Sequence, residues 1–456
     1  MKSKSIPGIF ACLFLFAVNA GAENTVINID PSEETGAVKV LNAVNNGPCT
    51  PKRTDQARDN FLVYKAARIP YARLHDSSLW RKHTVDILDI FPDFDADVND
   101  PASYDFLLTD NYLKTIIQAG AKPFYRLGES IENIPKRYRV LPPKDNEKWA
   151  KICEHIIRHY NEGWADGFHY DIEYWEIWNE PDYNPNCWDG TAEQFYDLFS
   201  TTAKYLKKKF PKLMIGGPAF CSSKAVEPFL CEMQKRKVPI DFVSWHRYSE
   251  DPEKYTKRAA QIRSWMDRYG YKDAKSIIDE WNYVKNWTTD FPYSCETMVS
   301  EKGAAYYGAI TVEFQNCSVD MSMYYDARPT TVFNGLFDLR TYAPMKPYWA
   351  LYAWSNLLEL GTTVRSVEDI PDVRVVSAKD DRGRLGIYLV RYNTDNNVTS
   401  PKTVSISING MELKGKRINV QTVDRYYDFG NYPYTIDGNV LDVQMQPNSL
   451  SYITIE

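Results

Sequence analysis

Short apolar segments alternate with longer helix-like segments along most of this 456-residue chain, and this alternation limits the possible folds more than any other feature. Such alternation is typical of parallel β/α units, in which each helix returns the chain to the same edge of the sheet. Eight strands are expected, over about 38–44, 67–74, 122–127, 174–180, 214–217, 242–245, 276–280 and 321–325. Eight such units predict an α/β fold, a closed (β/α)₈ TIM barrel over residues 37–360.

The pattern changes after Gly361. Short alternating strands follow, separated by Gly, Asn, Asp and Pro turns, with no amphipathic helix among them. This pattern predicts an antiparallel β-sandwich domain over residues 361–456. Residues 23–36 precede the barrel and include a strand-like segment over 25–30, which is a candidate to pair with the sandwich.

The first 22 residues have the features of a secretory signal peptide. Lys2 and Lys4 precede an apolar run over 9–18, and Ala20-Gly21-Ala22 supplies the small residues of a cleavage site. The run is too short to span a bilayer, and no other segment is long and apolar enough to do so. The sequence therefore predicts an exported protein, secreted or periplasmic, without a membrane span.

Charge and cysteine content argue against several kinds of partner. The net charge of −6 becomes more negative when residues 1–22 are removed, so a nucleic-acid partner is not expected. The cysteines form no CxxC pair, and their spacing fits neither a zinc site nor a disulfide scaffold. Asp93, Asp95 and Asp97 alternate like calcium ligands, but Val98 stands where that loop needs glycine. No metal ion and no cofactor is expected, and no oligomeric state follows.

Two segments place an acidic residue at an expected strand end. Residues 174–182 form an aromatic and apolar strand predicted to end at Glu180, because Pro181 lacks an N–H and favours an extended residue before it. Residues 276–282 form a second such strand, which ends in Glu280. The C-terminal ends of barrel strands share one rim, where active sites form. Two carboxyl groups there are the minimum for cleaving a glycosidic bond: one protonates the leaving oxygen, and the other attacks the anomeric carbon or activates water.

The residues around these glutamates resemble a known family. Trp178-Asn179-Glu180-Pro181 and Asp279-Glu280-Trp281-Asn282 are similar to the motifs of retaining (β/α)₈-barrel glycoside hydrolases, whose catalytic glutamates lie on strands four and seven. The stretches 176–182 and 244–249, with the trailing sandwich, most resemble glycoside hydrolase family 39, which includes β-xylosidases and α-L-iduronidase. The resemblance covers essentially the whole chain after residue 22.

The resemblance implies a role for each matching residue. Glu180 would be the general acid/base and would have to hold its proton near neutral pH, which repulsion from a second carboxylate favours. Glu280 would be the nucleophile, and Arg73 is the cation expected to keep it ionised. Asn179 would bind the sugar 2-hydroxyl. Further residues expected to bind substrate are His246 and Tyr248, which would orient the glutamates; Trp281 and Tyr325, which would line the floor of the site; and His75 and Glu129 near the rim.

The expected function is that of a secreted retaining exo-glycosidase, β-xylosidase-like, acting on plant or host oligosaccharides. Two alternatives stay open: a non-catalytic carbohydrate-binding protein on a barrel scaffold, and an endo-acting glycanase of a neighbouring family. The sugar itself is not determined. Arg247 and the loop Lys285-Asn286-Trp287 depart from the family pattern in places where the bound sugar could be recognised. Cationic groups there would suit an acidic sugar such as a uronate, whereas a neutral pentose needs none; the alternative is that these residues are exposed and have no role.

Overall fold

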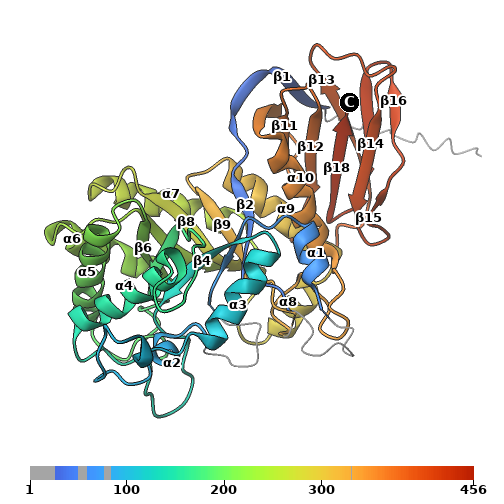
Figure 1. Ribbon diagram of the computed structural model, residues 1–456. Helices are drawn as coiled ribbons and strands as arrows, with labels where there is room; N and C mark the ends of the chain where they lie inside the picture. Colours follow the sequence, from blue (N-terminus) through green and yellow to red (C-terminus); the bar gives the residue numbers. More distant parts are fainter. Residues whose placement is uncertain (1–25, 50–58, 76–83, 330) are drawn as a thin grey trace, which may run out of the picture.

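The computed structural model describes residues 26–49, 59–75, 84–329 and 331–456 and contains a barrel beside a large curled sheet (Figure 1). Eight parallel strands close the barrel in chain order. They are β2 (Val40–Asn45), β3 (Tyr71–Arg73), β4 (Lys122–Leu127), β5 (Tyr174–Ile177), β6 (Met214–Phe220), β7 (Phe242–Tyr248), β8 (Lys275–Asn282) and β9 (Met321–Tyr324). The predicted fold class, a (β/α)₈ barrel followed by a β-sandwich, is confirmed.

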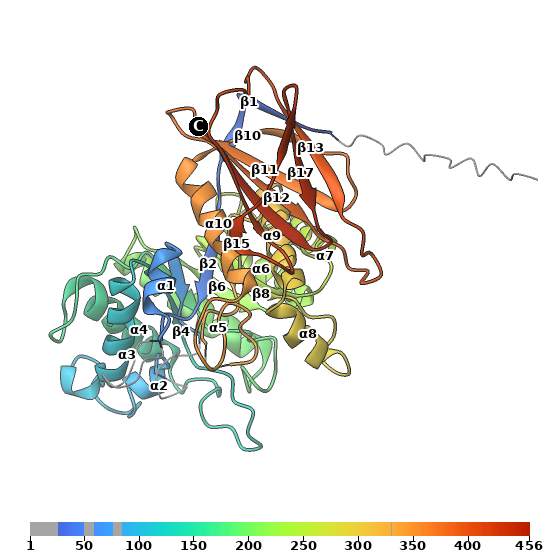
Figure 2. The ribbon, with the colours of Figure 1, turned by 90° about the vertical axis from the view of Figure 1, so that its right-hand side faces the viewer.

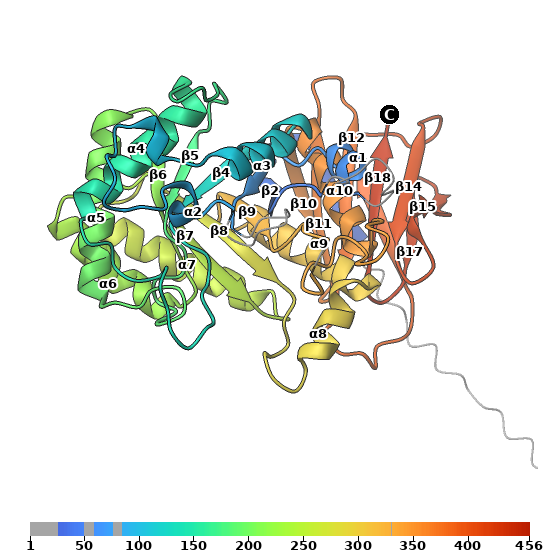
Figure 3. The same ribbon diagram turned by 60° about the horizontal axis from the view of Figure 1, so that its bottom comes forward.

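Helices surround the barrel (Figure 3). They are α1 (Phe61–Ala66), α3 (Leu107–Gln118), α4 (Asn146–Glu162), α5 (Ala192–Lys209), α6 (Ser223–Lys235), α7 (Glu253–Arg268), α8 (Phe291–Met298), α9 (Glu301–Gln315) and α10 (Lys346–Leu360). Helix α5 illustrates why they form: Thr191 and Gln194 make a reciprocal capping box at its start, and its apolar stripe is buried. None of the helices in the described ranges has the length and hydropathy needed to cross a bilayer.

The long connection between β3 and α3 is partly structured. Its described part, from residue 84, contains the short helix α2 (Ile87–Ile90) and a 3₁₀ turn, η1 (Pro101–Ser103). Asp100 caps that turn by accepting a hydrogen bond from the Ala102 amide at 3.0 Å. Two other acidic residues of this loop, Asp93 and Asp97, accept from the amides two residues later, at 3.0 and 2.9 Å. In the structure these three side chains therefore serve local turns.

The barrel interior consists of two layers. The lower layer is apolar, and its buried members are Ala43, Phe124, Tyr174, Phe242, Ile277, Met321 and Met323. Because side chains two apart on a strand face the same way, Glu176 lies directly above Tyr174 and faces the interior of the barrel. A charged layer containing Arg73, Glu176 and Asp279, all fully buried, therefore separates the apolar layer from the rim.

The second sheet has ten strands in the order β15-β14-β18-β12-β11-β10-β1-β13-β17-β16. Its strands are β1 (Val26–Ala37), β10 (Thr362–Val367), β11 (Val373–Lys379), β12 (Leu385–Arg391), β13 (Lys402–Ile408), β14 (Ile418–Val423), β15 (Asp428–Asn431), β16 (Thr435–Asp437), β17 (Val440–Met445) and β18 (Ser449–Ile455). The sheet curls around an apolar core of its own (Figure 2). Strand β1 pairs antiparallel with β10 and parallel with β13, so the segment before the barrel completes this sheet.

Helices α9 and α10 lie between the barrel and the sheet (Figure 1). The Tyr388 hydroxyl donates to the Ala350 carbonyl at 3.1 Å, and the Tyr388 and Trp354 rings meet edge to face at 5.1 Å. The two domains thus share one continuous apolar core, which runs from the barrel helices into the sheet. This packing fixes the position of the sheet on the side of the barrel formed by α9 and α10.

Gly308 lets α9 approach the sheet closely. A Cβ atom there would lie 2.7 Å from Val390 and 2.8 Å from Leu450. Alanine in place of glycine normally stabilises a helix by about 1 kcal/mol, but here overpacking is expected to reverse the sign and cost about 1–3 kcal/mol. Urea denaturation of Gly308→Ala should therefore give a lower midpoint than wild type. The exposed α5 substitution Lys208→Ala is the control, and a Gly308→Ala midpoint at or above wild type would contradict this packing.

Candidate active site

A cavity of about 680 Å³ opens at the C-terminal ends of the barrel strands. Its wall contains seven of the residues predicted to be catalytic or to bind substrate: His75, Asn179, Glu180, His246, Tyr248, Glu280 and Tyr325. They come from the ends of five different strands, so closure of the barrel brings together residues up to 250 positions apart, from 75 to 325. Asp76, the neighbour of His75, lies outside the described residues.

Glu180 does not end its strand as predicted. Strand β5 stops at Ile177, and Trp178 and Glu180 both have left-handed backbones, with φ of 74° and 45°. The Glu180 amide donates to the Ala219 carbonyl at 3.1 Å, and the Glu180 carbonyl accepts from the Tyr183 amide at 2.8 Å. These bonds outweigh the extended preference that Pro181 imposes on the residue before it. The resulting tight turn presents the Glu180 side chain to the cavity.

Glu280 faces the cavity because β8 contains a bulge. Trp245 pairs with Ile278, but His246 pairs with Glu280, so Asp279 is an extra residue in the ladder. In a regular strand Asp279 and Glu280 would point to opposite faces. With the bulge, both carboxylates reach Arg73, at 3.1 and 2.8 Å. Strand β8 continues to Asn282, so Glu280 lies within the strand and not at its end as predicted.

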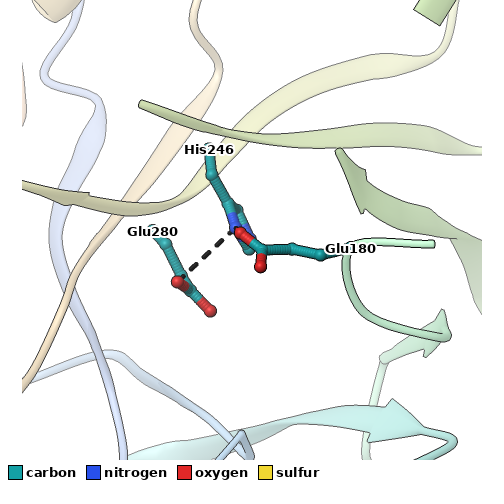
Figure 4. Close-up of side chains that lie close together, drawn as sticks. All are labelled: Glu180, His246 and Glu280. Atoms are coloured by element: carbon teal, nitrogen blue, oxygen red, sulfur yellow. Dashed lines mark hydrogen bonds and ion pairs between the residues drawn. The ribbon is translucent and has the colours of Figure 1, made fainter. Parts of the chain in front are cut away.

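The carboxylates of Glu180 and Glu280 face each other across the cavity with His246 beside them (Figure 4). One oxygen of each glutamate and one His246 nitrogen all lie within 4.8 Å of one another. His246 Nδ1 lies 2.7 Å from Glu180 and 3.5 Å from Glu280. Carboxyl groups about 5–5.5 Å apart are typical of retaining glycosidases, whereas inverting enzymes leave room for a water molecule at about 6.5–9.5 Å. The close approach here fits the retaining arrangement.

Arg73 connects the groups beneath the cavity. Its Nε donates to Glu176 at 2.7 Å, its Nη1 to Glu280 at 2.8 Å and to Asn45 at 3.1 Å, and its Nη2 to Asn179 at 2.7 Å. Because the oxygen of the Asn179 amide is held by Arg73, the NH₂ group is the part left to donate into the cavity. The Tyr248 hydroxyl donates to the second Glu280 oxygen at 2.8 Å. Glu280 is therefore fixed through both oxygens.

Burial and the neighbouring charges set the protonation of these groups. Burial raises the pKa of Glu280, and the charges of His246 and Arg73 act against that rise. Burial lowers the pKa of His246, but Glu280 and Asp279 outweigh it, so that pKa lies well above its ordinary value and the ring is cationic at neutral pH. Burial also raises the pKa of Tyr248, which keeps its phenol as a hydrogen-bond donor. The cavity thus holds two permanent donors and one imidazolium around Glu280.

A second carboxyl pair lies under the first. Burial raises the pKa of Glu176 well above its ordinary value, and the charge of Asp279 adds to the rise. Burial acts the same way on Asp279, but Arg73 and a hydrogen bond from Glu176 outweigh it and lower the pKa of Asp279. Glu176 is therefore the protonated partner, and its second oxygen accepts from Ser244 Oγ at 2.6 Å. Arg73 is left with the charges of Asp279 and Glu280 to balance.

Substitution of Glu176 tests this protonation state. Glu176→Ala removes the oxygens that accept from Arg73 Nε and Ser244 Oγ and is expected to cost about 3 kcal/mol or more of unfolding free energy. Glu176→Gln keeps a neutral group of the same shape, so its cost is expected to be about 1 kcal/mol. Urea denaturation at pH 7 measures both. Equal losses for the two variants would mean that Glu176 is ionised.

Three residues expected at the site lie elsewhere. Trp281 has no exposed surface; the bulge at Asp279 turns it outward, against Tyr307 and Tyr324, at ring distances of 5.2 Å each. It cannot line the floor of the cavity. Glu129 is also outside the cavity wall: it accepts from the Leu88 amide at 3.0 Å and pairs with Arg139 at 3.2 Å.

Lys285 likewise turns away from the cavity. Its ammonium lies 3.5 Å from Asp290 and over the Tyr293 ring, so it offers no charge to a bound sugar. Arg247, the other cation noted in the sequence, does line the cavity. A neighbouring arginine, Arg258 of α7, joins it there, and no motif in the sequence indicated this position.

An aromatic platform at the mouth of the cavity was not predicted. Trp287 stacks on Phe291 and Phe333, with ring centroids 5.5 and 5.6 Å apart, and meets Tyr248 edge to face at 5.2 Å. Trp287 is 58% exposed, so one face of its ring is open to a ligand. Exposed aromatic faces offer apolar area at low entropic cost. In the sequence, the only signal was that residues 285–287 departed from the family pattern.

Within the described residues, Glu180, His246 and Glu280 are the carboxylate and imidazole groups close enough together to hold a metal ion. Arg73 and Tyr248 already donate to both oxygens of Glu280. A cationic guanidinium 2.8 Å from one ligand oxygen would oppose a bound cation. The arrangement is suited instead to proton transfer and nucleophilic attack by paired carboxyl groups.

Comparison with known proteins gives a consistent result. The model of the family "Glycosyl hydrolases family 39" matches residues 25–427. A β-xylosidase of Caldicellulosiruptor saccharolyticus is 30% identical over 163 residues, 33% of this chain and 32% of that protein. A β-xylosidase of Geobacillus stearothermophilus is 30% identical over 185 residues, 38% of this chain and 36% of that protein. Each of these matches thus spans about a third of the relative.

Solved structures resemble the whole fold. A glucosidase from Croceicoccus marinus superimposes with a TM-score of 0.79 at 21% identity, covering 94% of this chain and 98% of its own. A monomeric β-xylosidase from Caulobacter crescentus has a TM-score of 0.73 at 17% identity, covering 95% and 99%. At these identities the likeness concerns the fold: barrel and sheet occur together, in this arrangement, in both proteins.

Proposed function

This chain belongs to glycosyl hydrolases family 39 and is a glycoside hydrolase acting on carbohydrate, and from this membership we propose that it is an exported, exo-acting β-xylosidase-like enzyme that retains anomeric configuration. The observation that carries the mechanism is the approach of Glu180 and Glu280 oxygens within 4.8 Å. The β-xylosidase specificity rests on the names of the two relatives. Export rests on residues 1–22, which lie outside the described residues.

In the first step, Glu280 attacks the anomeric carbon while Glu180 gives its proton to the leaving oxygen. The donors from Arg73 and Tyr248 hold the Glu280 carboxylate in place, so little reorganisation is needed when it attacks. A glycosyl ester on Glu280 and a free leaving group result. In the second step, Glu180 takes a proton from water, which attacks the same carbon and releases the sugar with its original configuration.

Two neighbouring groups support the transition state. The Asn179 amide, held through its oxygen by Arg73, offers its NH₂ group to the 2-hydroxyl, a hydrogen bond that strengthens as charge develops on the ring. His246 lies beside both glutamates, so its positive charge can stabilise whichever of them is ionised in each step. Tyr325 lines the cavity and supplies an aromatic face beside the sugar.

A panel of 4-nitrophenyl glycosides and xylo-oligosaccharides tests the proposal. The expected result is turnover of the β-xyloside and stepwise release of single sugar units from one end of the oligosaccharides. Release of internal fragments would make the enzyme endo-acting. If the enzyme prefers another glycoside, the sugar of that glycoside takes the place of xylose in the proposal. Lack of turnover of every substrate would contradict the proposed function.

The pH dependence of kcat/KM is expected to respond to His246. Below its pKa, Glu280 is protonated and cannot attack, so activity falls on the acid side. His246 is a cation that lowers the pKa of Glu280. The variant His246→Asn should therefore move the acid limb to higher pH by about 1 unit. The control is His155→Asn on α4, outside the cavity. A limb that stays in place or moves to lower pH in His246→Asn would contradict the charge assigned to this ring.

A further inference from the structure

Two arginines stand together in the cavity wall on the Glu180 side. Arg247 lies near the end of β7, and Arg258 comes from α7. Nη1 of Arg258 donates to the carbonyl oxygens of His246 at 2.7 Å and Cys221 at 3.1 Å, which attaches the helix to the barrel rim. The Cys221 and Ser222 amides in turn donate to Asp182, two residues after Glu180. The arginines thus share one wall with the loop that carries Glu180.

The charges of this pair are not balanced by a carboxylate. Among the described residues, neither Arg247 nor Arg258 has an acidic oxygen within 4.0 Å, and Nε of Arg247 is buried without a hydrogen-bond partner. Burial, and after it the charge of Arg247, lowers the pKa of Arg258 to about 10. The arginines that are buried more completely, Arg73, Arg126 and Arg391, each pair with at least one carboxylate. An unpaired, half-buried cation costs free energy that a bound anion would recover.

The place of the pair relative to the two glutamates decides which part of a substrate it meets. The sugar that is attacked lies over Glu280, and the leaving group departs past Glu180, the acid that protonates it. Asp182, whose charge acts on Arg258, accepts hydrogen bonds from the backbone amides of Cys221 and Ser222 and makes no ion pair with either guanidinium. A planar guanidinium binds a carboxylate or a sulfate through two parallel hydrogen bonds.

We propose that Arg247 and Arg258 form a subsite for an oxyanion, a carboxylate or a sulfate ester, carried by the leaving-group sugar. The subsite rests on the proposed function, because the assignment of Glu180 as the acid defines the leaving-group side. The natural substrate would then be a glycoside attached to a uronic acid or to a sulfated sugar. The sugar that Glu280 attacks does not have to carry a charge to use this subsite.

Calorimetric titration of the mature protein with D-glucuronate, D-glucose 6-sulfate and D-glucose tests the subsite without requiring turnover. The anionic sugars are expected to bind at least about tenfold more tightly than glucose, with an affinity that falls as salt is added. The anionic sugar that binds more tightly shows whether the subsite recognises a carboxylate or a sulfate ester. Arg247→Gln should reduce their affinity to that of glucose, and Arg247→Lys should restore part of it.

Lys285→Gln, which removes a nearby cation outside the cavity, is the matched control and should bind the anions as wild type does. Thermal unfolding of each variant checks that it is folded. Equal binding of anionic and neutral sugars, absence of binding by all three, or full anion binding in folded Arg247→Gln would each overturn the subsite. Lack of aryl-glycoside turnover with anion binding intact would overturn the proposed function and leave the anion site standing.

Discussion

Replacing Glu280 by alanine is expected to reduce kcat on a 4-nitrophenyl glycoside by on the order of 10⁵-fold or more, because no other group can form the glycosyl ester. The structure offers no substitute among the groups around Glu280: Tyr248 donates to it, the His246 ring lies 3.5 Å from it, and Asp279 lies beneath it against Arg73. Removing Glu280 also leaves Arg73 with one fewer carboxylate, so the variant must be checked for folding by its unfolding midpoint.

Steady-state kinetics of Glu280→Ala measures this loss directly. The control is Glu154→Gln, a substitution of a buried glutamate in α4 that pairs with Arg158 and lies outside the cavity; its kcat should stay near wild type. A folded Glu280→Ala variant with more than a few per cent of wild-type kcat would exclude Glu280 as the nucleophile.

The second large effect is expected for Glu180→Ala, and its size should depend on the leaving group. Without the acid, a substrate whose leaving group needs protonation should lose about 10²–10⁴-fold in rate, whereas 2,4-dinitrophenolate, which leaves unaided, should lose far less in the first step. The second step then becomes limiting, because no base activates water. Azide is a nucleophile that needs no base, so it should restore turnover and yield a glycosyl azide.

Kinetics of Glu180→Ala with both leaving groups, with and without azide, separates this role from a structural one. The same azide addition to wild type and to Glu280→Ala is the control, and neither should give a glycosyl azide of retained configuration. Equal rate losses for good and poor leaving groups, or absence of azide rescue in folded Glu180→Ala, would contradict the acid/base assignment.

Much of the fold could be predicted from the local pattern of apolar and polar residues, because this pattern is strong where a segment is fully buried. Strand β4 begins and ends at the predicted residues, 122–127. Strand β3 is only Tyr71–Arg73, shorter than predicted, and α6 was not predicted at all. Strands β15 and β16 are short and largely exposed, so no apolar alternation marks them in the sequence.

The site was predictable only where residue type alone constrains chemistry. The tetrapeptides around Glu180 and Glu280 indicated both glutamates, but not how each side chain reaches the cavity. The bulge at Asp279 depends on pairing with β7, a neighbour not adjacent in sequence, and it turns Trp281 out of the site. Arg258 enters the wall from a helix, where its sequence spacing resembles that of any solvent-facing arginine. Such positions follow from packing, which a single sequence does not display.

The measurement that tests the central claim most directly is proton NMR of the first sugar released from the preferred glycoside, recorded before the free anomers interconvert. Carboxyl oxygens within 4.8 Å of each other fit the short separation of retaining enzymes and not the about 6.5–9.5 Å that inverting enzymes need to place a water molecule against the sugar. We therefore predict that the first-formed sugar has the same anomeric configuration as the substrate. An inverted first product would contradict double displacement through Glu280.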